Sequence, residues 1–200
     1  MKNSKIYLAA TLFSLLTFNA STGYAEETKP YQYANNYAEY SLTLPEAPLA
    51  KTLWGDVDKI PYLDNPPKAG FVGESATYIT TDPETDETFG VEITFLKADK
   101  DFINSLNEEK LMGFIERDLS AYKNMENKSK KFKASETDGT KQGSISGVII
   151  NTENKPIFRA EHFLTGSASI MVIKVRYNLE NKKMNEYYKT LVSSIKYLPL

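Results

Sequence analysis

The single histidine, His162, is the first residue to consider as a catalytic group, because the chain contains no cysteine. It would have to act alone as an imidazole base. Its neighbour Glu161 cannot orient it, because consecutive side chains on a strand point to opposite faces. We therefore expect a partly exposed strand histidine without a catalytic role. One histidine and no cysteine also leave no ordinary zinc or copper site, so we expect neither a metal nor a cofactor.

The run Gly143-Ser144-Ile145-Ser146-Gly147 is similar to the nucleophile elbow of hydrolases. That motif, G-x-S-x-G, needs serine in the middle on a strand-to-helix turn, whereas Ile145 stands there in a strand-like segment. The chain also has no G-x-G-x-x-G and no P-loop, so nucleotide chemistry has no support. No catalytic residue is predicted.

Three acids, Asp82, Glu84 and Asp86, are spaced like the opening of a calcium loop. Such a loop needs glycine at its sixth position and glutamate at its twelfth. Glu87 and Ile93 occupy those positions. The segment therefore indicates a solvated turn between two strands.

Three basic residues form a candidate anion-binding patch. Lys174 and Arg176 share one face of a predicted strand, and Arg159 lies on the strand expected to pair with it. Glu161 and Glu92 have spacings that could place them on the same face. The simpler interpretation is therefore a solvated, salt-bridged sheet face, and the alternative is a site for an anionic group.

The segment from Pro45 to Gly70 is long for a connection inside a domain and holds five prolines and the single tryptophan, Trp54. One interpretation is an ordered excursion that packs on the sheet. The other is a partner-binding loop, because long ordered loops often carry function and large aromatic residues dominate interfaces. In that case Trp54, Asp56, Asp58 and Tyr62 are the candidate partner-binding residues.

The amino terminus has the pattern of a secretory signal peptide. Lys2 and Lys5 precede an uncharged, largely apolar run, Ile6–Phe18, and the small residues Gly23 and Ala25 fit a signal peptidase site. We expect cleavage after Ala25 and a periplasmic or secreted product; a retained membrane anchor is the alternative. No second long apolar run follows, so the mature chain is not expected to span a membrane.

The composition is that of an ordinary globular protein, with 41% hydrophobic residues. Lysine and arginine number 24 against 26 acidic residues, so no excess positive charge is available to bind nucleic acid. An exported chain without disulfides must rely on its hydrophobic core. We expect a flexible lead-in over residues 26–36 and a single domain over residues 37–200.

Hydrophobic periodicity predicts the elements of that domain. Strands are expected before Pro45 and in three hairpins, over 71–80 with 88–98, 132–137 with 141–152, and 156–164 with 168–177. A capping box at Ser105 opens a helix with a stripe at Leu111, Ile115, Leu119 and Tyr122, and the final helix has its stripe from Met184 to Leu198. The pattern predicts an α+β fold, a mostly antiparallel sheet of about six to seven strands with two amphipathic helices covering one face.

Two segments resemble the PsbP-like superfamily. They are the strand Tyr40-Ser41-Leu42-Thr43-Leu44-Pro45 and the carboxy-terminal part, with a turn at Gly166, a strand over Ile170–Tyr177 and a helix through Leu191–Ile195. The resemblance spans about residues 37–198. It implies an antiparallel sheet between helices and an accessory or binding role, with no catalytic residues to carry over.

Two classes of function follow from these observations. The favoured one is an exported, non-catalytic accessory or binding protein that acts through the loop at 45–70 and the adjoining sheet. Its partner would be another exported or envelope protein, or a small ligand. The alternative is a small periplasmic hydrolase that uses two carboxylates. Paired acids in a deep pocket would favour the enzyme, and a shallow apolar surface would favour the binding protein.

Overall fold

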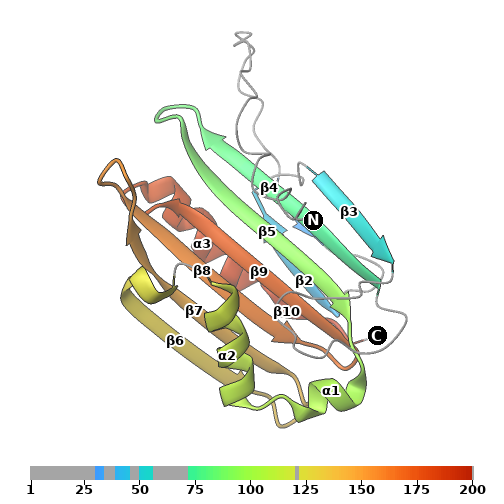
Figure 1. Ribbon diagram of the computed structural model, residues 1–200. Helices are drawn as coiled ribbons and strands as arrows, with labels where there is room; N and C mark the ends of the chain where they lie inside the picture. Colours follow the sequence, from blue (N-terminus) through green and yellow to red (C-terminus); the bar gives the residue numbers. More distant parts are fainter. Residues whose placement is uncertain (1–29, 34–38, 46–49, 56–71, 120–121, 200) are drawn as a thin grey trace, which may run out of the picture.

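A seven-stranded antiparallel sheet forms the centre of the molecule, with strand order β3-β4-β5-β9-β8-β7-β6 (Figure 1). The computed structural model describes residues 30–33, 39–45, 50–55, 72–119 and 122–199, with backbone alone at 50–55, 72–75, 118 and 122. The strands are β3 (Ala50–Gly55), β4 (Val72–Asp82), β5 (Glu87–Lys97), β6 (Glu126–Ala134), β7 (Lys141–Ile150), β8 (Pro156–Thr165) and β9 (Ser169–Asn178). The α+β class and the strand number expected from the sequence are confirmed.

A second, three-stranded sheet joins the two ends of the chain in the order β1-β2-β10. Its strands are β1 (Tyr31–Tyr33), β2 (Tyr40–Leu44) and β10 (Lys196–Tyr197). The expected flexible lead-in is therefore wrong at residues 31–33, where Tyr31 pairs with Leu44 and Tyr33 with Leu42. Tyr33 is fully buried, so a segment that looks polar in the sequence contributes to the core.

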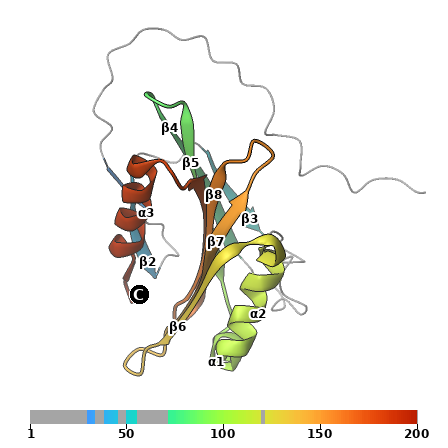
Figure 2. The same ribbon diagram turned by 90° about the vertical axis from the view of Figure 1, so that its left-hand side faces the viewer.

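The helices lie on opposite faces of the large sheet (Figure 2). They are α1 (Lys100–Ser105), α2 (Glu108–Asp118), the 3-10 turn η1 (Tyr122–Asn124) and α3 (Lys182–Ser194). The expectation that both amphipathic helices cover one face is wrong. Both faces of the central strands are apolar: Phe163 and Val172 pack with α2, whereas Leu164 and Ile173 face α3. Each face therefore needs its own cover.

Two hydrophobic cores result from this arrangement. The larger lies between the sheet, α3 and the small sheet, and includes Tyr40, Phe89, Phe95, Met171 and Leu191. The smaller lies beneath α2. In the part of the chain that the structure describes, no helix is long and apolar enough to cross a membrane.

The helical segment after β5 is broken into two helices. The expected capping box at Ser105 is wrong, because Asp99 caps α1 and Asn107 caps α2 by accepting a hydrogen bond from the amide of Lys110 at 2.9 Å. Leu106, between the helices, is 2% exposed. Because Leu106 is packed in the core, the helix is interrupted at this residue. The spacing of the apolar residues in the sequence does not show the interruption.

The final helix ends earlier than its apolar stripe suggests. Leu191 is fully buried, as expected, but α3 stops at Ser194 and Leu198 is 44% exposed. Beyond the helix, Lys196 and Tyr197 pair with Ser41 and Tyr40 of β2. The amide of Leu198 also donates to the carbonyl of Glu39. Strand pairing with β2 has replaced the last helical turn.

Candidate functional site

One half of the sheet face that carries α2 is not covered by the helix. Helix α2 packs on β7 and β8, and beside it a cavity of about 310 Å³ opens over β4, β5, β9 and β8. We call it the charged bay. Its lining includes Thr77, Ile79, Gly90, Glu92, Leu119, Arg159, Glu161, Lys174 and Arg176.

Strand register arranges the charged side chains of the bay in two rows. The first row runs Glu92, Lys174, Glu161 across β5, β9 and β8. The second row runs Gly90, Arg176, Arg159 across the same strands. The first row alternates in sign, which stabilises cross-strand neighbours, whereas the second places two arginines directly opposite each other, which does not.

The arginine pair is the unusual feature of the bay. The Nε of Arg159 is buried and has no hydrogen-bond partner among the described residues. Burial, together with the nearby charge of Arg176, lowers the pKa of Arg159 from its usual value. Gly90 makes room for Arg176, because a Cβ at residue 90 would lie 3.3 Å from Arg176 Cγ. The second row thus places two cations side by side on β8 and β9.

The fold therefore brings together all three residues of the patch proposed from the sequence. Arg159, Lys174 and Arg176 line one cavity, and so do the acids Glu92 and Glu161. Arg176 is exposed, and Arg159 and Lys174 are half-buried, so the cations remain within reach of a ligand. Binding of an anion there stays a prediction.

The two glycines of the elbow-like run have a packing role. A Cβ at Gly143 would collide with Leu111 of α2 and would lie 3.2 Å from Ile115. At Gly147 a Cβ would lie 2.9 Å from the carbonyl oxygen of Glu126. The run lies within β7, as expected, and its glycines allow α2 and the start of β6 to approach the sheet.

His162 lies on the opposite face of the sheet from Glu161, and its side chain points toward α3. The residue is 9% exposed, so the expectation of a partly exposed histidine is wrong. Its Nε2 lies 3.1 Å from the hydroxyl of Tyr188, and the imidazole ring packs beside the tyrosine ring. Burial, with a smaller effect from the charge of Lys131, lowers the pKa of His162 to about 4.

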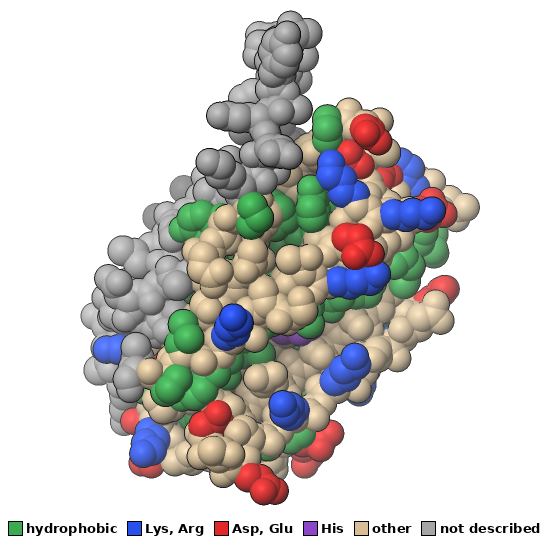
Figure 3. All heavy atoms as spheres, turned by 180° about the vertical axis from the view of Figure 1, so that it is seen from behind, with side chains coloured by type: hydrophobic (Ala, Val, Ile, Leu, Met, Phe, Trp, Pro, Cys, Tyr) green, Lys and Arg blue, Asp and Glu red, His purple; other side chains and the backbone are tan. Residues whose placement is uncertain are grey.

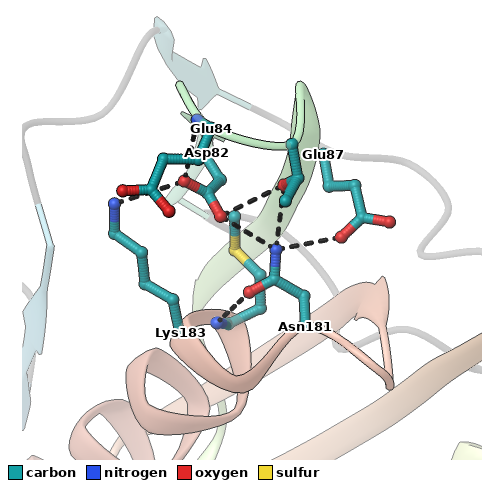
Figure 4. Close-up of polar contacts among 7 residues, drawn as sticks. Asp82, Glu84, Glu87, Asn181 and Lys183 are labelled. Atoms are coloured by element: carbon teal, nitrogen blue, oxygen red, sulfur yellow. Dashed lines mark hydrogen bonds and ion pairs between the residues drawn. The ribbon is translucent and has the colours of Figure 1, made fainter.

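The acidic turn between β4 and β5 holds the start of α3 (Figure 4). The side-chain amide of Asn181 donates to Asp82 at 3.0 Å, Thr85 at 3.1 Å and Glu87 at 2.9 Å. Asn181 also caps α3 by accepting from the amide of Met184. Asp82 is only 5% exposed, so the expectation of a solvated turn is wrong for that residue.

Nothing in the described residues supports a metal at this turn. They contain no cluster of three or more histidine or acidic side chains arranged to hold an ion. Lys183 lies 3.5 Å from Asp82, and the side-chain amide of Asn181 donates to both Asp82 and Glu87. In the sequence, the signal for this contact between α3 and the β4–β5 turn is Asn181, a helix-capping residue type just before the apolar stripe that begins at Met184.

A buried carboxylate at Glu39 escaped the sequence analysis. Glu39 is fully buried and accepts hydrogen bonds from the Ser167 amide at 2.8 Å, the Ala168 amide at 3.1 Å and the Ser169 hydroxyl at 2.5 Å. Burial by itself raises the pKa of Glu39, but these donors and the Ser167 hydroxyl outweigh it and hold the pKa below the usual value. The carboxylate fastens the second sheet to the β8–β9 turn.

The predicted partner-binding loop is partly a strand. Residues 50–55 form β3, which pairs with β4, so this part of the connection from 45 to 70 is a strand of the sheet and not a loop. Trp54 pairs with Gly73 through its backbone, and its side chain lies outside the described part of the structure. Asp56, Asp58 and Tyr62 also lie outside the described residues.

Comparison with known proteins gives weak structural likenesses. No protein-family model and no curated protein matches the chain. The solution structure of cyanobacterial PsbP (CyanoP) from Synechocystis sp. PCC 6803 matches over 89% of this chain and 98% of that one, at 13% identity and a TM-score of 0.45. The crystal structure of LpqN, involved in cell envelope biogenesis of Mycobacterium tuberculosis, matches over 86% and 90%, at 14% identity and a TM-score of 0.40. The match to CyanoP agrees with the weak resemblance of the sequence to the PsbP-like superfamily.

Proposed function

We propose that this chain is an exported, non-catalytic binding or accessory protein whose charged bay holds an anionic group. The group would belong to a small ligand or to another exported or envelope protein. Carboxylate and phosphate are the chemical classes that suit the site, because guanidinium groups bind both through paired hydrogen bonds. Export rests on the signal-peptide pattern of residues 1–25.

The observation that carries the proposal is the cross-strand pair of Arg159 and Arg176. Two like charges in register repel each other, and the Nε of Arg159 is buried with no partner among the described residues. An anion between the two guanidinium groups would relieve the repulsion and satisfy that donor. Among the described residues that line the bay, Lys174 adds a third cation beside the acids Glu92 and Glu161.

One observation favours the alternative function, a hydrolase that uses two carboxylates. Glu92 and Glu161 both line the bay, on strands separated by β9. However, Lys174 stands between them in the register. A cation between the acids forms an alternating row of charges, whereas a glycosidase leaves that space for the sugar and water. The arrangement therefore supports binding better than hydrolysis.

The segment from 45 to 70 remains a second part of this proposal. Strand β3 lies next to β4, and β4 contributes Thr77 and Ile79 to the bay. A partner bound at the bay could therefore extend to this edge of the sheet. Trp54→Ala should then weaken capture of the partner while leaving the binding of a small anion at the bay unchanged.

Calorimetric titration with inorganic phosphate and with acetate tests the bay directly. The wild-type chain should bind at least one of the two, and Arg159→Ala and Arg176→Ala should each weaken binding by roughly tenfold or more. Lys182→Ala is the matched control, because Lys182 is an exposed cation at the start of α3 that does not line the bay. The proposal would be contradicted if both arginine variants bound the anion as tightly as the wild type does. It would also be contradicted if the wild type bound neither anion.

A further inference from the structure

A second concave surface lies on the other face of the sheet. Helix α3 lies over β5 and β9, and between the helix and strands β6, β7 and β8 runs a groove of about 980 Å³. We call it the lysine groove. Figure 3 shows this side of the molecule, with several basic side chains in blue around the histidine in purple.

Strand register accounts for the polar floor of the groove. Lys131 of β6 pairs with Ser144 of β7, which pairs with His162 of β8. One step along the same face, Lys133 pairs with Gln142. Hydroxyl and amide groups thus lie beside two lysines, and α3 supplies an opposite wall of mixed apolar and polar side chains.

The charge of the groove differs from that of the whole chain. Four lysines and no acid are found among the described residues that line it, although the chain has a net charge of −2. Lys130 and Lys189 form ion pairs with Glu116 and Glu186. Lys131 and Lys133 form no ion pair with any described residue. On the β6 side of the groove, the described part of the chain therefore supplies no acid to pair with these two lysines.

The outer edge of β6 adds a second feature to this surface. Strand β6 is the last strand of the large sheet, and within the described residues it pairs only with β7. Eight of its nine side chains are exposed. An edge strand presents backbone donors and acceptors that can pair with another chain. The lysines of β6 would repel a second copy of the same edge, so an acidic strand is the complementary occupant.

We propose that β6 and the lysine groove bind an extended acidic polypeptide segment of a partner, which adds as a further strand beside β6. Main-chain hydrogen bonds to the edge would give this interaction its affinity, and the pairing of acidic side chains with Lys131 and Lys133 its specificity. The site is separate from the charged bay, which lies on the opposite face of the sheet.

A synthetic peptide tests this proposal. The probe is a fluorescein-labelled nine-residue peptide of alternating glutamate and valine, matched in length to β6. Fluorescence anisotropy should show saturable binding to the mature chain. The double variant Lys131→Glu, Lys133→Glu should weaken binding by roughly tenfold or more. Hydrogen exchange of the amides over residues 126–134 should slow when the peptide is bound.

Two controls keep the outcome decisive. The double variant Lys100→Glu, Lys182→Glu changes the net charge equally at exposed positions that do not line the groove, and it should bind the peptide within about twofold of wild type. The same peptide methylated on every backbone nitrogen keeps its charge but cannot donate to β6, so it should not bind. If the methylated peptide bound as tightly as the unmethylated one, the proposal that the peptide adds as a strand beside β6 would be wrong. Equal binding by the Lys131→Glu, Lys133→Glu chain, or displacement of the peptide by phosphatidylglycerol vesicles, would overturn the proposed occupant.

Discussion

Glu39 shows how much of this fold depends on single buried polar groups. Its carboxylate accepts hydrogen bonds from two backbone amides and from the hydroxyls of Ser167 and Ser169. All of these donors lie in the β8–β9 turn or at the first residue of β9. Gly166 is needed beside it, because a Cβ there would collide with the carboxylate. A buried charge is tolerated at this position because hydrogen bonds replace its lost hydration.

Glu39→Gln should lower the free energy of unfolding by about 2 kcal/mol at neutral pH, because the amide nitrogen would face donors that now meet an oxygen. The folded pKa of Glu39 lies below its usual value of 4.5. Its stabilising contribution is therefore complete above that pH and is lost as the pH falls through the folded pKa. Urea titrations of both chains at neutral and acidic pH check this; a difference that does not shrink in acid would contradict it.

The imidazole of His162 should remain neutral over most of the physiological range. Its folded pKa is about 4, because the ring is buried against Tyr188. The unfolded chain binds a proton near pH 6.5, so stability should decrease as the pH falls from 6.5 toward 4. Since the chain has one histidine, a single set of imidazole NMR signals reports the titration directly. A midpoint near 6.5 in the folded protein would show that the ring is solvated.

At the scale of elements, close contact between a helix and a glycine determines where α2 lies. Gly143 of β7 allows Leu111 and Ile115 to lie directly on the strand, and both of these side chains are fully buried. Gly113, on α2 itself, has open space around the position of a Cβ. The two glycines therefore have different roles, and replacing each of them with alanine distinguishes these roles.

Gly143→Ala should lower the free energy of unfolding by about 1–3 kcal/mol, because the added methyl group must displace α2 from the sheet. Gly113→Ala should raise it by roughly 0.5–1 kcal/mol, since alanine is the better helix former and meets no neighbour. Thermal and urea unfolding of the two variants gives both values. Equal effects of the two substitutions would mean that α2 does not pack on β7 as described.

For the whole molecule, each helix covers only half of a sheet face, and the uncovered halves carry the charged bay and the lysine groove. The two surfaces lie on opposite faces of the large sheet, the faces on which α2 and α3 lie (Figure 2). The anion site and the peptide site proposed above would therefore be compatible with each other on one chain.

The exported chain should begin at Glu26. The basic residues Lys2 and Lys5, the apolar run Ile6–Phe18 and the small residues before the site predict cleavage after Ala25. Mass spectrometry of the protein recovered from the exporting cell measures this directly, and Ala25→Arg should block processing because the residue at the cleavage site must be small. A full-length product held in the membrane would mean that the segment is an anchor.

Local patterns in the sequence predicted the three hairpins, the buried stripe through Leu191 and the α+β class, because turn residues and hydrophobic periods act over a few neighbouring positions. The expected start of the second hairpin at residue 132 is wrong, because β6 begins at Glu126 in a stretch whose exposed, charged side chains show no hydrophobic period. They also placed Arg159, Lys174 and Arg176 on adjoining strands. Only the tertiary structure decided that α2 and α3 take opposite faces, that Tyr31–Tyr33 forms a strand, and that Arg159 lies opposite Arg176. The same holds for Glu39, whose hydrogen-bond partners at 167–169 lie more than a hundred residues away. Register and long-range pairing depend on the sum of many distant contacts, and no local pattern of residues carries that information.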